Sequence, residues 1–208
     1  MSFFALHDAA AACLRRLPAE TAHNAALWGL RHGLGPHVPA TTDPILKTTA
    51  FGLDFPNPLG RAAGFDKNAR AAAEVFGFGF GFIEVGGVTP RPQQGNPRPR
   101  LFRLPADQAV INRMGFNNHG ATAVRDRLAA LDNPGIIGVN LAANADSLDP
   151  IVDFEHLVAA FAPVAAFLTL DISCPNTANG KVFLSPGPLT DLLARVRALL
   201  PSPDTPIL

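Results

Sequence analysis

The stretch Gly135-Ile136-Ile137-Gly138-Val139-Asn140-Leu141-Ala142-Ala143-Asn144 joins a short apolar run to small and polar residues. Its first seven residues have the length and composition of a buried strand. The same change of character recurs at Gly64-Phe65-Asp66-Lys67, Gly86-Gly87-Val88-Thr89 and Asp171-Ile172-Ser173-Cys174. Polar residues and glycines that gather at the carboxyl ends of parallel strands are typical of barrel enzymes. The pattern therefore favours an α/β fold of the (β/α)8 TIM-barrel type.

Helical patterns separate these apolar runs, and strands that alternate with helices indicate βαβ units around a parallel sheet. The predicted helices cover Asn68 to Phe76, His119 to Leu131, Phe154 to Phe167 and Leu189 to Leu200, and Pro163 is expected to kink the third of them. The predicted strands cover Phe80 to Val85, Gly135 to Leu141 and Leu168 to Ile172, with Pro206-Ile207-Leu208 opening another. Gly86-Gly87 is expected to end the first strand, and a long polar connection from Thr89 to Asp107 follows it.

A doubly wound nucleotide-binding sheet is the other arrangement that right-handed crossovers allow. That fold usually carries a G-x-G-x-x-G loop after its first strand. The run Phe76-Gly77-Phe78-Gly79-Phe80-Gly81-Phe82 does not supply such a loop, because Phe82 stands where a third glycine is needed. The run also enters a strand, so we interpret its glycines as packing positions.

The first 40 residues predict a helical hairpin, and residues 41–208 predict the barrel region. Ser2 can cap a helix that runs to about Leu17, and Pro18 suits the first turn of a second helix that ends near Gly33. Two interpretations remain open for this hairpin. It packs on its own domain, which the residues alone favour, or its broad apolar faces lie on a membrane surface.

Composition excludes several classes of protein. The chain has 208 residues, of which 48% are hydrophobic, enough for a domain with a substantial core. Lys+Arg and Asp+Glu both total 17, so no net charge attracts nucleic acid. Cys13 and Cys174 do not suggest a disulfide framework, and no apolar run approaches the roughly 20 residues that span a bilayer. We expect a soluble or peripherally bound intracellular protein.

Two motifs are candidates for ligand binding. Ala62-Ala63-Gly64-Phe65-Asp66-Lys67-Asn68 sets small residues and a lysine at a strand end, where a planar cofactor can approach the backbone. The alternative is a loop in which Lys67 is solvated and Asp66 caps the next helix. Asn112-Arg113-Met114-Gly115-Phe116-Asn117-Asn118 supplies amide donors and acceptors, although asparagine and glycine also favour ordinary turns.

Ser173-Cys174-Pro175-Asn176-Thr177 follows a predicted strand and places a cysteine at the same end of the barrel as Lys67 and Asn112. A thiol there can act as a base or nucleophile in a site that excludes water. A lone cysteine is more often a small core residue, so its position carries the prediction. None of the histidines has the spacing of metal ligands.

Five motifs together resemble the dihydroorotate dehydrogenase family, in its membrane-associated, quinone-reducing class. They are Asn57-Pro58-Leu59-Gly60, Ala62 to Lys67, Gly87 to Gln93, Gly95 to Arg103, and Ile111 to Asn118. The resemblance runs from the N-terminal hairpin to Leu208, and the block from Thr89 to Asn118 is its most specific part.

The resemblance implies an FMN-dependent barrel that oxidises dihydroorotate to orotate in the synthesis of pyrimidines, with quinone as the electron acceptor. It implies contacts to FMN from Ala63, Gly64, Lys67, Gly87, Asn140 and Asp171. It implies a substrate pocket lined by Lys67, Asn112, Arg113, Met114, Gly115, Phe116, Asp171 and Asn176. Cys174 stands at the position of the catalytic base. The hairpin would cap a quinone tunnel with Arg103 at its inner end, and would attach the protein peripherally to the cytoplasmic face of the cell membrane.

The segments Ala142 to Ala145 and Ala178 to Lys181 depart from the family pattern, and so do three of the predicted site positions. Cys174 stands where the quinone class generally has serine, Asp171 replaces an asparagine, and Gly87 replaces a threonine that contacts the flavin. These departures keep a second hypothesis open, a flavin barrel that acts on another cyclic amide. A barrel of this kind typically needs about 250 residues, so we expect only about the first half of its strands here. A truncated, non-catalytic remnant is the third hypothesis.

Overall fold

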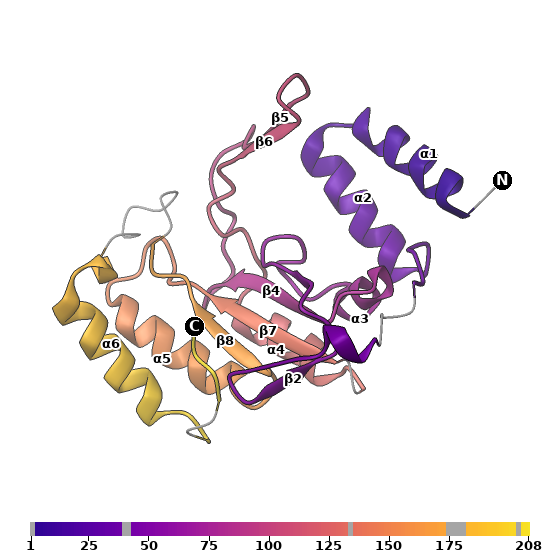
Figure 1. Ribbon diagram of the computed structural model, residues 1–208. Helices are drawn as coiled ribbons and strands as arrows, with labels where there is room; N and C mark the ends of the chain where they lie inside the picture. The colour runs from indigo at the N-terminus through magenta and orange to yellow at the C-terminus, as the bar shows by residue number, and fades with distance from the viewer. Residues whose placement is uncertain (1–2, 39–42, 133–134, 174–181, 203–204) are drawn as a thin grey trace.

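The computed structural model describes residues 3–38, 43–132, 135–173, 182–202 and 205–208 (Figure 1). Helices α1 (Phe3–Arg15) and α2 (Ala19–Arg31) form the predicted hairpin, which lies to one side of the sheet. Leu27 and Leu30 of α2 join the main hydrophobic core. The hairpin is therefore packed on the barrel region through one face of α2.

A parallel sheet carries the rest of the fold. Among the described residues its strands are β3 (Gly60–Arg61), β4 (Phe82–Val88), β7 (Ile136–Leu141) and β8 (Phe167–Leu170), in the spatial order β3-β4-β7-β8. Every neighbouring pair is parallel. Ile207 pairs in parallel with Leu168, as predicted for the end of the chain. The predicted parallel α/β sheet is confirmed.

Alternate residues of these strands face opposite sides of the sheet. Ile83 and Val85 of β4 and Val139 of β7 are buried in one core cluster with residues of α4 (Ala121–Ala129), α5 (Pro150–Phe161) and α6 (Pro186–Ala198). Burying a side chain of this size contributes about 1.5–3 kcal/mol. The helices are thus held on one face, as in the wall of a barrel.

Large and small side chains alternate on the other face, near the amino ends of the strands. The rings of Phe82 and Phe167 lie 6.3 Å apart, and a side chain at Gly138 would overlap the Phe167 ring. The ring centroids of Phe55 and Phe82 lie 5.1 Å apart. Phe55 belongs to the antiparallel hairpin of β1 (Thr48–Ala50) and β2 (Leu53–Phe55). Aromatic packing therefore fills the amino end of the sheet and leaves the carboxyl end to polar residues.

The helix predicted from Asn68 to Phe76 is shorter in the structure. Helix α3 covers Ala72–Val75 and continues as a 3-10 turn over Phe76–Phe78. The Asp66 carboxylate accepts hydrogen bonds from the amides of Asn68 at 3.3 Å and Ala71 at 2.7 Å. Ala69 has a φ of 50°. This side-chain competition for backbone amides explains why the helix begins late.

The long connection after β4 also contains structure that the sequence did not predict. Strand β4 continues through Gly86 and Gly87 to Val88, and β5 (Leu101–Leu104) and β6 (Ala109–Asn112) form an antiparallel hairpin that projects towards α1 and α2 (Figure 1). Neither strand alternates regularly between buried and exposed residues, so no period-2 pattern marks it. Further 3-10 turns cover Pro44–Leu46 and Val182–Leu184.

Two other expectations concern proline and glycine. Helix α5 ends at Phe161, so Pro163 follows the helix and does not kink it. The helix starts earlier than predicted because the Asp149 carboxylate accepts hydrogen bonds from the amides of Ile151 and Val152.

Gly77 packs against the backbone of Pro36, and the Val38 amide donates a hydrogen bond to the Gly77 carbonyl at 2.8 Å. The packing role predicted for the phenylalanine-glycine run is confirmed at Gly77.

Candidate functional site

A cavity of about 360 Å³ opens at the carboxyl end of the parallel sheet. Its lining comes from the ends of β3, β4, β7 and β8 and from the segment after β6. The lining residues are Ala62, Ala63, Gly64, Lys67, Glu84, Gly87, Asn112, Met114, Gly115, Phe116, Asn140 and Asp171. Most of the residues for which the sequence predicted a cofactor or substrate contact are therefore gathered in one place.

Lys67 is held over this cavity by the loop after β3. Its ammonium group donates a hydrogen bond to the Gly64 carbonyl at 3.0 Å. Gly64 has a φ of 98°, a conformation that favours glycine, and a Cβ there would lie 3.3 Å from Lys67 Nζ. Lys67 is half-buried and lines the cavity, so the alternative of a fully solvated lysine does not hold.

Gly87 allows the cavity wall to come close to the sheet. A Cβ at Gly87 would lie 2.7 Å from the Phe116 ring and 3.0 Å from Asn140 Oδ1. Protein side chains do not pack at such distances, so Phe116 and Asn140 can take these positions only because residue 87 is glycine. The glycine at position 87 thus leaves room for the neighbouring aromatic ring.

Among the described residues, two carboxyl groups line the cavity, those of Glu84 and Asp171, and the sequence predicted a role for Asp171. Burial and, to a lesser degree, the charge of Glu84 raise the pKa of Asp171 above its usual value. Glu84 Oε2 accepts from the Ala63 amide at 3.4 Å, while its buried Oε1 has no hydrogen-bond partner among the described residues. Glu84 was missed, although an acidic residue between Ile83 and Val85 in an apolar strand is an available signal.

The asparagine-rich segment has one asparagine that lines the cavity and another that forms buried hydrogen bonds within the fold. Asn112 lines the cavity and accepts from the Met114 amide at 2.9 Å. Asn118 is 5% exposed, and its amide donates to Thr89 Oγ1 at 2.8 Å and to the Phe116 carbonyl at 2.7 Å. The hydrogen bonds of Asn118 fit the turn interpretation of this motif, and the position of Asn112 keeps the ligand interpretation as a proposal for that residue.

Other predicted residues lie elsewhere. Arg113 is exposed and donates to the Pro99 carbonyl at 2.8 Å, so its side chain does not line the cavity. Arg103 donates to the carbonyl oxygens of Arg15 at 3.1 Å and Leu17 at 2.6 Å, at the turn between α1 and α2. The predicted base Cys174 and the predicted substrate contact Asn176 lie outside the described residues.

A second cavity of about 860 Å³ lies between the helical hairpin and the barrel region. Its lining is mainly apolar and includes Leu14, Ala26, Trp28, Leu30, Leu34, Val38, Phe65 and Phe78. Phe65 belongs to the same loop as Gly64 and Lys67, which line the polar cavity. A single loop therefore separates an apolar cavity from a polar one.

His23 of α2 packs against this loop. Its ring meets the Phe65 ring edge-on, with centroids 5.5 Å apart. Burial lowers the pKa of His23, and the positive charge of Lys67 lowers it further. The shift favours the neutral imidazole at the contact between the hairpin and the loop.

A parallel β/α sheet with a lysine, amides and carboxyl groups at its carboxyl edge defines a barrel-type enzyme site. A family model described as dihydroorotate dehydrogenase matches residues 45–199. The chain belongs to this family.

Similar proteins agree with this assignment. A protein named dihydroorotate dehydrogenase (quinone) from Rhodopseudomonas palustris strain HaA2 is 54% identical over 202 residues, which cover 94% of this chain and 55% of the relative. A protein of the same name from Bradyrhizobium diazoefficiens is 52% identical over 201 residues, with the same coverage. The chain thus spans about half the length of the curated relatives that it matches.

Solved structures show the same fold. A crystal structure of DHODH from Eimeria tenella in complex with ferulenol superposes with a TM-score of 0.81 at 36% identity, over 86% of this chain and 50% of that one. A ligand-free structure from the same organism gives a TM-score of 0.81 over 87% of this chain and 52% of that one. The predicted barrel class is confirmed, and the described parallel strands form part of that barrel.

Proposed function

We propose that this chain contributes part of the active site of an FMN-dependent dihydroorotate dehydrogenase, which oxidises dihydroorotate to orotate in de novo pyrimidine biosynthesis and passes the electrons to quinone. One observation carries the proposal. A single cavity collects Lys67, Asn112 and Asn140 from three separate segments of a chain that belongs to this family. Ala62, Ala63 and Gly64 add a part of the lining that carries no bulky side chain.

The residues present fit a flat, anionic cofactor such as FMN. Ala62, Ala63 and Gly64 offer a surface of backbone and methyl groups, on which a planar ring can lie. The ammonium group of Lys67 supplies a cation beside that surface. Bound FMN would supply the electron acceptor for the substrate. We expect Ala63, Gly64, Lys67, Gly87, Asn140 and Asp171 to contact it.

The rest of the lining suits a small ring with amide groups and a carboxylate. Asn112 and Asn140 can each donate and accept hydrogen bonds, and Met114, Gly115 and Phe116 shape the wall beside them. A charged Asp171 would repel a substrate carboxylate. Burial raises the pKa of Asp171, and when this carboxyl group is protonated its O–H can donate in place of the asparagine amide.

Cys174 is the proposed base that takes a proton from the substrate carbon. It follows Asp171, which lines the cavity, by three residues in the sequence. A cysteine thiol has a reference pKa of about 8.5 and forms a thiolate far more readily than a serine hydroxyl loses its proton. The substitution of cysteine for serine is therefore compatible with proton abstraction.

The apolar cavity between the hairpin and the barrel suits a quinone. Its lining by Trp28, Leu34 and Phe65 matches the apolar ring and tail of such an acceptor. Trp28 and Leu34 are also 55% and 66% exposed, so part of the hairpin surface is available to a membrane. Among the described helices, none has the length and apolar character to cross a bilayer. We propose peripheral attachment at the cytoplasmic face of the cell membrane.

The test is turnover by the purified full-length protein. We expect bound FMN and reduction of a soluble quinone that depends on added dihydroorotate. A protein that retains FMN but does not oxidise dihydroorotate would contradict the substrate assignment. Oxidation of a cyclic amide without a carboxylate, such as dihydrouracil, would then favour the second candidate, which the departure at Asp171 motivates.

A further inference from the structure

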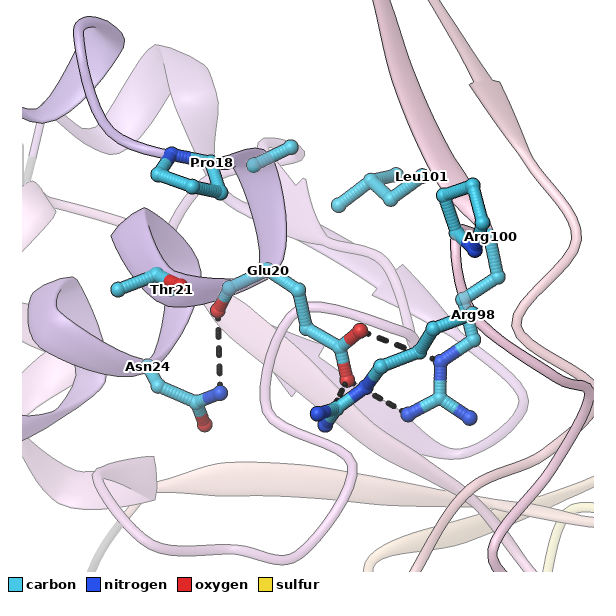
Figure 2. Close-up of a pocket in the computed structure, with 9 residues that line it drawn as sticks. Pro18, Glu20, Thr21, Asn24, Arg98, Arg100 and Leu101 are labelled. Carbon is cyan, nitrogen blue, oxygen red and sulfur yellow. Dashed lines mark hydrogen bonds and ion pairs between the residues drawn. The ribbon is translucent and has the colours of Figure 1, made fainter.

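Arg100 lies between the helical hairpin and the loops of the barrel. It comes from the segment just before β5 and is 6% exposed (Figure 2). One side of its guanidinium group binds the Glu20 carboxylate of α2, with Nη2 2.6 Å from Oε1 and Nε 3.3 Å from Oε2. Arg98 reaches the same carboxylate at 2.9 Å, but its side chain is 71% exposed.

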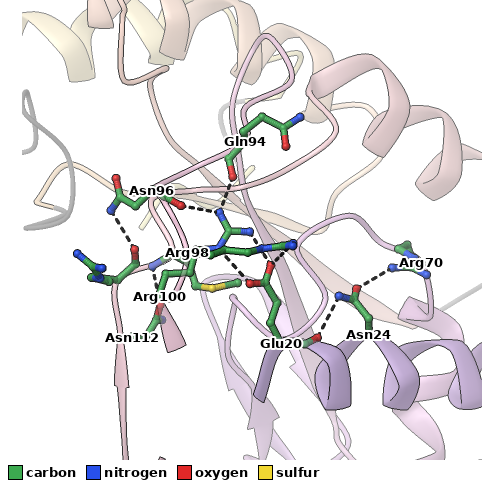
Figure 3. Close-up of polar contacts among 10 residues, drawn as sticks. Glu20, Asn24, Arg70, Gln94, Asn96, Arg98, Arg100 and Asn112 are labelled. Atoms are coloured by element: carbon green, nitrogen blue, oxygen red, sulfur yellow. Dashed lines mark hydrogen bonds and ion pairs between the residues drawn. The ribbon is translucent and has the colours of Figure 1, made fainter. Parts of the chain in front are cut away.

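The other side of the same guanidinium group binds the barrel loop. Arg100 Nη1 donates to the carbonyl oxygen of Asn96 at 3.0 Å and to that of Gln94 (Figure 3). Planar donors in a fixed fork can hold two partners at set angles, which the ammonium group of lysine cannot do. Arg100 therefore joins α2 directly to residues 94–96.

Residues 94–96 in turn support a wall of the polar cavity. Asn96 Nδ2 donates to the Arg113 carbonyl and the Asn96 amide donates to the Met114 carbonyl, each at 2.9 Å. A Cβ at Gly115 would lie 2.8 Å from Asn96, so the two segments are in close contact. Met114 and Gly115 line the cavity. The hydrogen bonds thus run without a break from α2 to the cavity wall.

We propose that Arg100 is a positioning residue that sets the docking of the helical hairpin and the shape of the Met114–Gly115 wall together. Glu20 bonds to the hairpin side of Arg100, and Asn96 bonds to its cavity side. This inference rests on the proposed function, since the hairpin forms the apolar cavity and the wall forms the substrate cavity. Arg100 acts through these neighbours and does not line the polar cavity.

The experiment compares variants of the full-length protein with dihydroorotate and a soluble quinone as varied substrates. Glu20→Gln weakens only the hairpin side, so we expect the KM for quinone to rise about tenfold and the KM for dihydroorotate to stay within about twofold. Arg100→Gln weakens both sides, and we expect both KM values to rise about tenfold. The matched control is Arg98→Gln, which should leave both values within about twofold because Arg98 is exposed.

A general loss of stability would not change the KM for quinone and the KM for dihydroorotate differently in the different variants. The melting temperatures of all variants are measured as a check on stability. A wild-type KM for dihydroorotate in Arg100→Gln would overturn the proposal, as would equal effects of Arg98→Gln and Arg100→Gln. If Arg100→Gln does not fold, Arg100→Lys replaces it. We expect Arg100→Lys to raise at least one KM about tenfold, because an ammonium group cannot span both sides. Wild-type values of both would overturn the proposal.

Hydrogen exchange separates this inference from the proposed function, because it needs no substrate. We expect Arg100→Lys to speed the exchange of backbone amides both in α2 and in residues 113–115. Glu20→Gln should speed exchange in α2 alone. Arg98→Gln should leave exchange unchanged in both regions. Unchanged exchange at residues 113–115 in Arg100→Lys would overturn the positioning role. A failure of the wild-type protein to oxidise dihydroorotate, with the expected exchange pattern, would instead overturn the proposed function.

Discussion

Lys67 Nζ lies 3.0 Å from the carbonyl oxygen of Gly64 and donates a hydrogen bond to it, so the loop after β3 folds back over the polar cavity. Phe65, between these two residues, lines the apolar cavity on the other side of the loop. The loop therefore places a cation in one cavity and an aromatic ring in the other.

Replacing Lys67 should weaken binding of anionic ligands. Lys67→Met keeps much of the side-chain length but removes the charge, and we expect the affinity for orotate to fall by about tenfold or more. Isothermal titration calorimetry of the full-length protein with orotate measures this directly. Lys47→Met is the control, because Lys47 is exposed and lies outside the cavity. Equal orotate affinity in the wild type and in Lys67→Met would remove Lys67 from the substrate site.

Asp171 should make stability depend on pH. The pKa of Asp171 is raised in the folded protein. The contribution of Asp171 to the free energy of unfolding is therefore fully present below its unfolded pKa of 3.8 and is lost as the pH rises through its folded pKa. Asp171→Asn removes this loss, so we expect a higher melting temperature at pH 7 and no gain at a pH below about 4.

The control is Asp146→Asn. Arg91 lowers the pKa of Asp146 through a hydrogen-bonded ion pair at the surface, so loss of this carboxylate should not raise the melting temperature. A melting temperature of Asp171→Asn equal to or below that of the wild type at pH 7 would show that burial of the carboxylate is not a cost to folding.

His23 should weaken the docking of the hairpin at acid pH. Its folded pKa is lowered, so its contribution to stability is present above the unfolded value of 6.5 and is lost as the pH falls through the folded value. We expect His23→Gln to lose less stability than the wild type as the pH falls below about 6.5. Thermal melting across this range, with the exposed His32→Gln as control, measures the difference. Parallel curves for the wild type and His23→Gln would contradict the role of His23.

Cys174→Ala tests the proposed base. We expect reduction of the bound flavin by dihydroorotate to slow by at least about 100-fold, as is typical when a general base is removed, while FMN stays bound. Stopped-flow absorbance measures the rate, and Cys13→Ala serves as the control because Cys13 is exposed on α1. An unchanged rate in Cys174→Ala would exclude Cys174 from proton abstraction.

Much of the fold could be predicted because its signals are local. Buried strands such as Ile136–Leu141 are short apolar runs, and polar residues at their ends indicate the functional edge of a parallel sheet. Helix α3 was predicted too long because the signal against it is not periodic. It depends on the Asp66 carboxylate, which binds the amides of Asn68 and Ala71.

Residues of the candidate site could be predicted where they belong to a recognisable motif. They could not be predicted where the tertiary fold determines which way a side chain points. Lys67 and Asn112 lie in recognisable motifs and line the cavity as predicted. Arg113 lies in the same motif as Asn112, yet its side chain turns outward to the Pro99 carbonyl, a direction that no sequence pattern specifies. Glu84 reaches the cavity because of its place in β4, and its partner is the Ala63 amide from another strand end.

The most direct test of the central claim is to mix the flavin-loaded, full-length protein with dihydroorotate in the absence of oxygen and to follow the absorbance of oxidised flavin. We predict that this absorbance is lost as orotate forms, that added quinone restores it, and that dihydrouracil leaves it unchanged. Bound flavin whose absorbance does not respond to dihydroorotate would contradict the account.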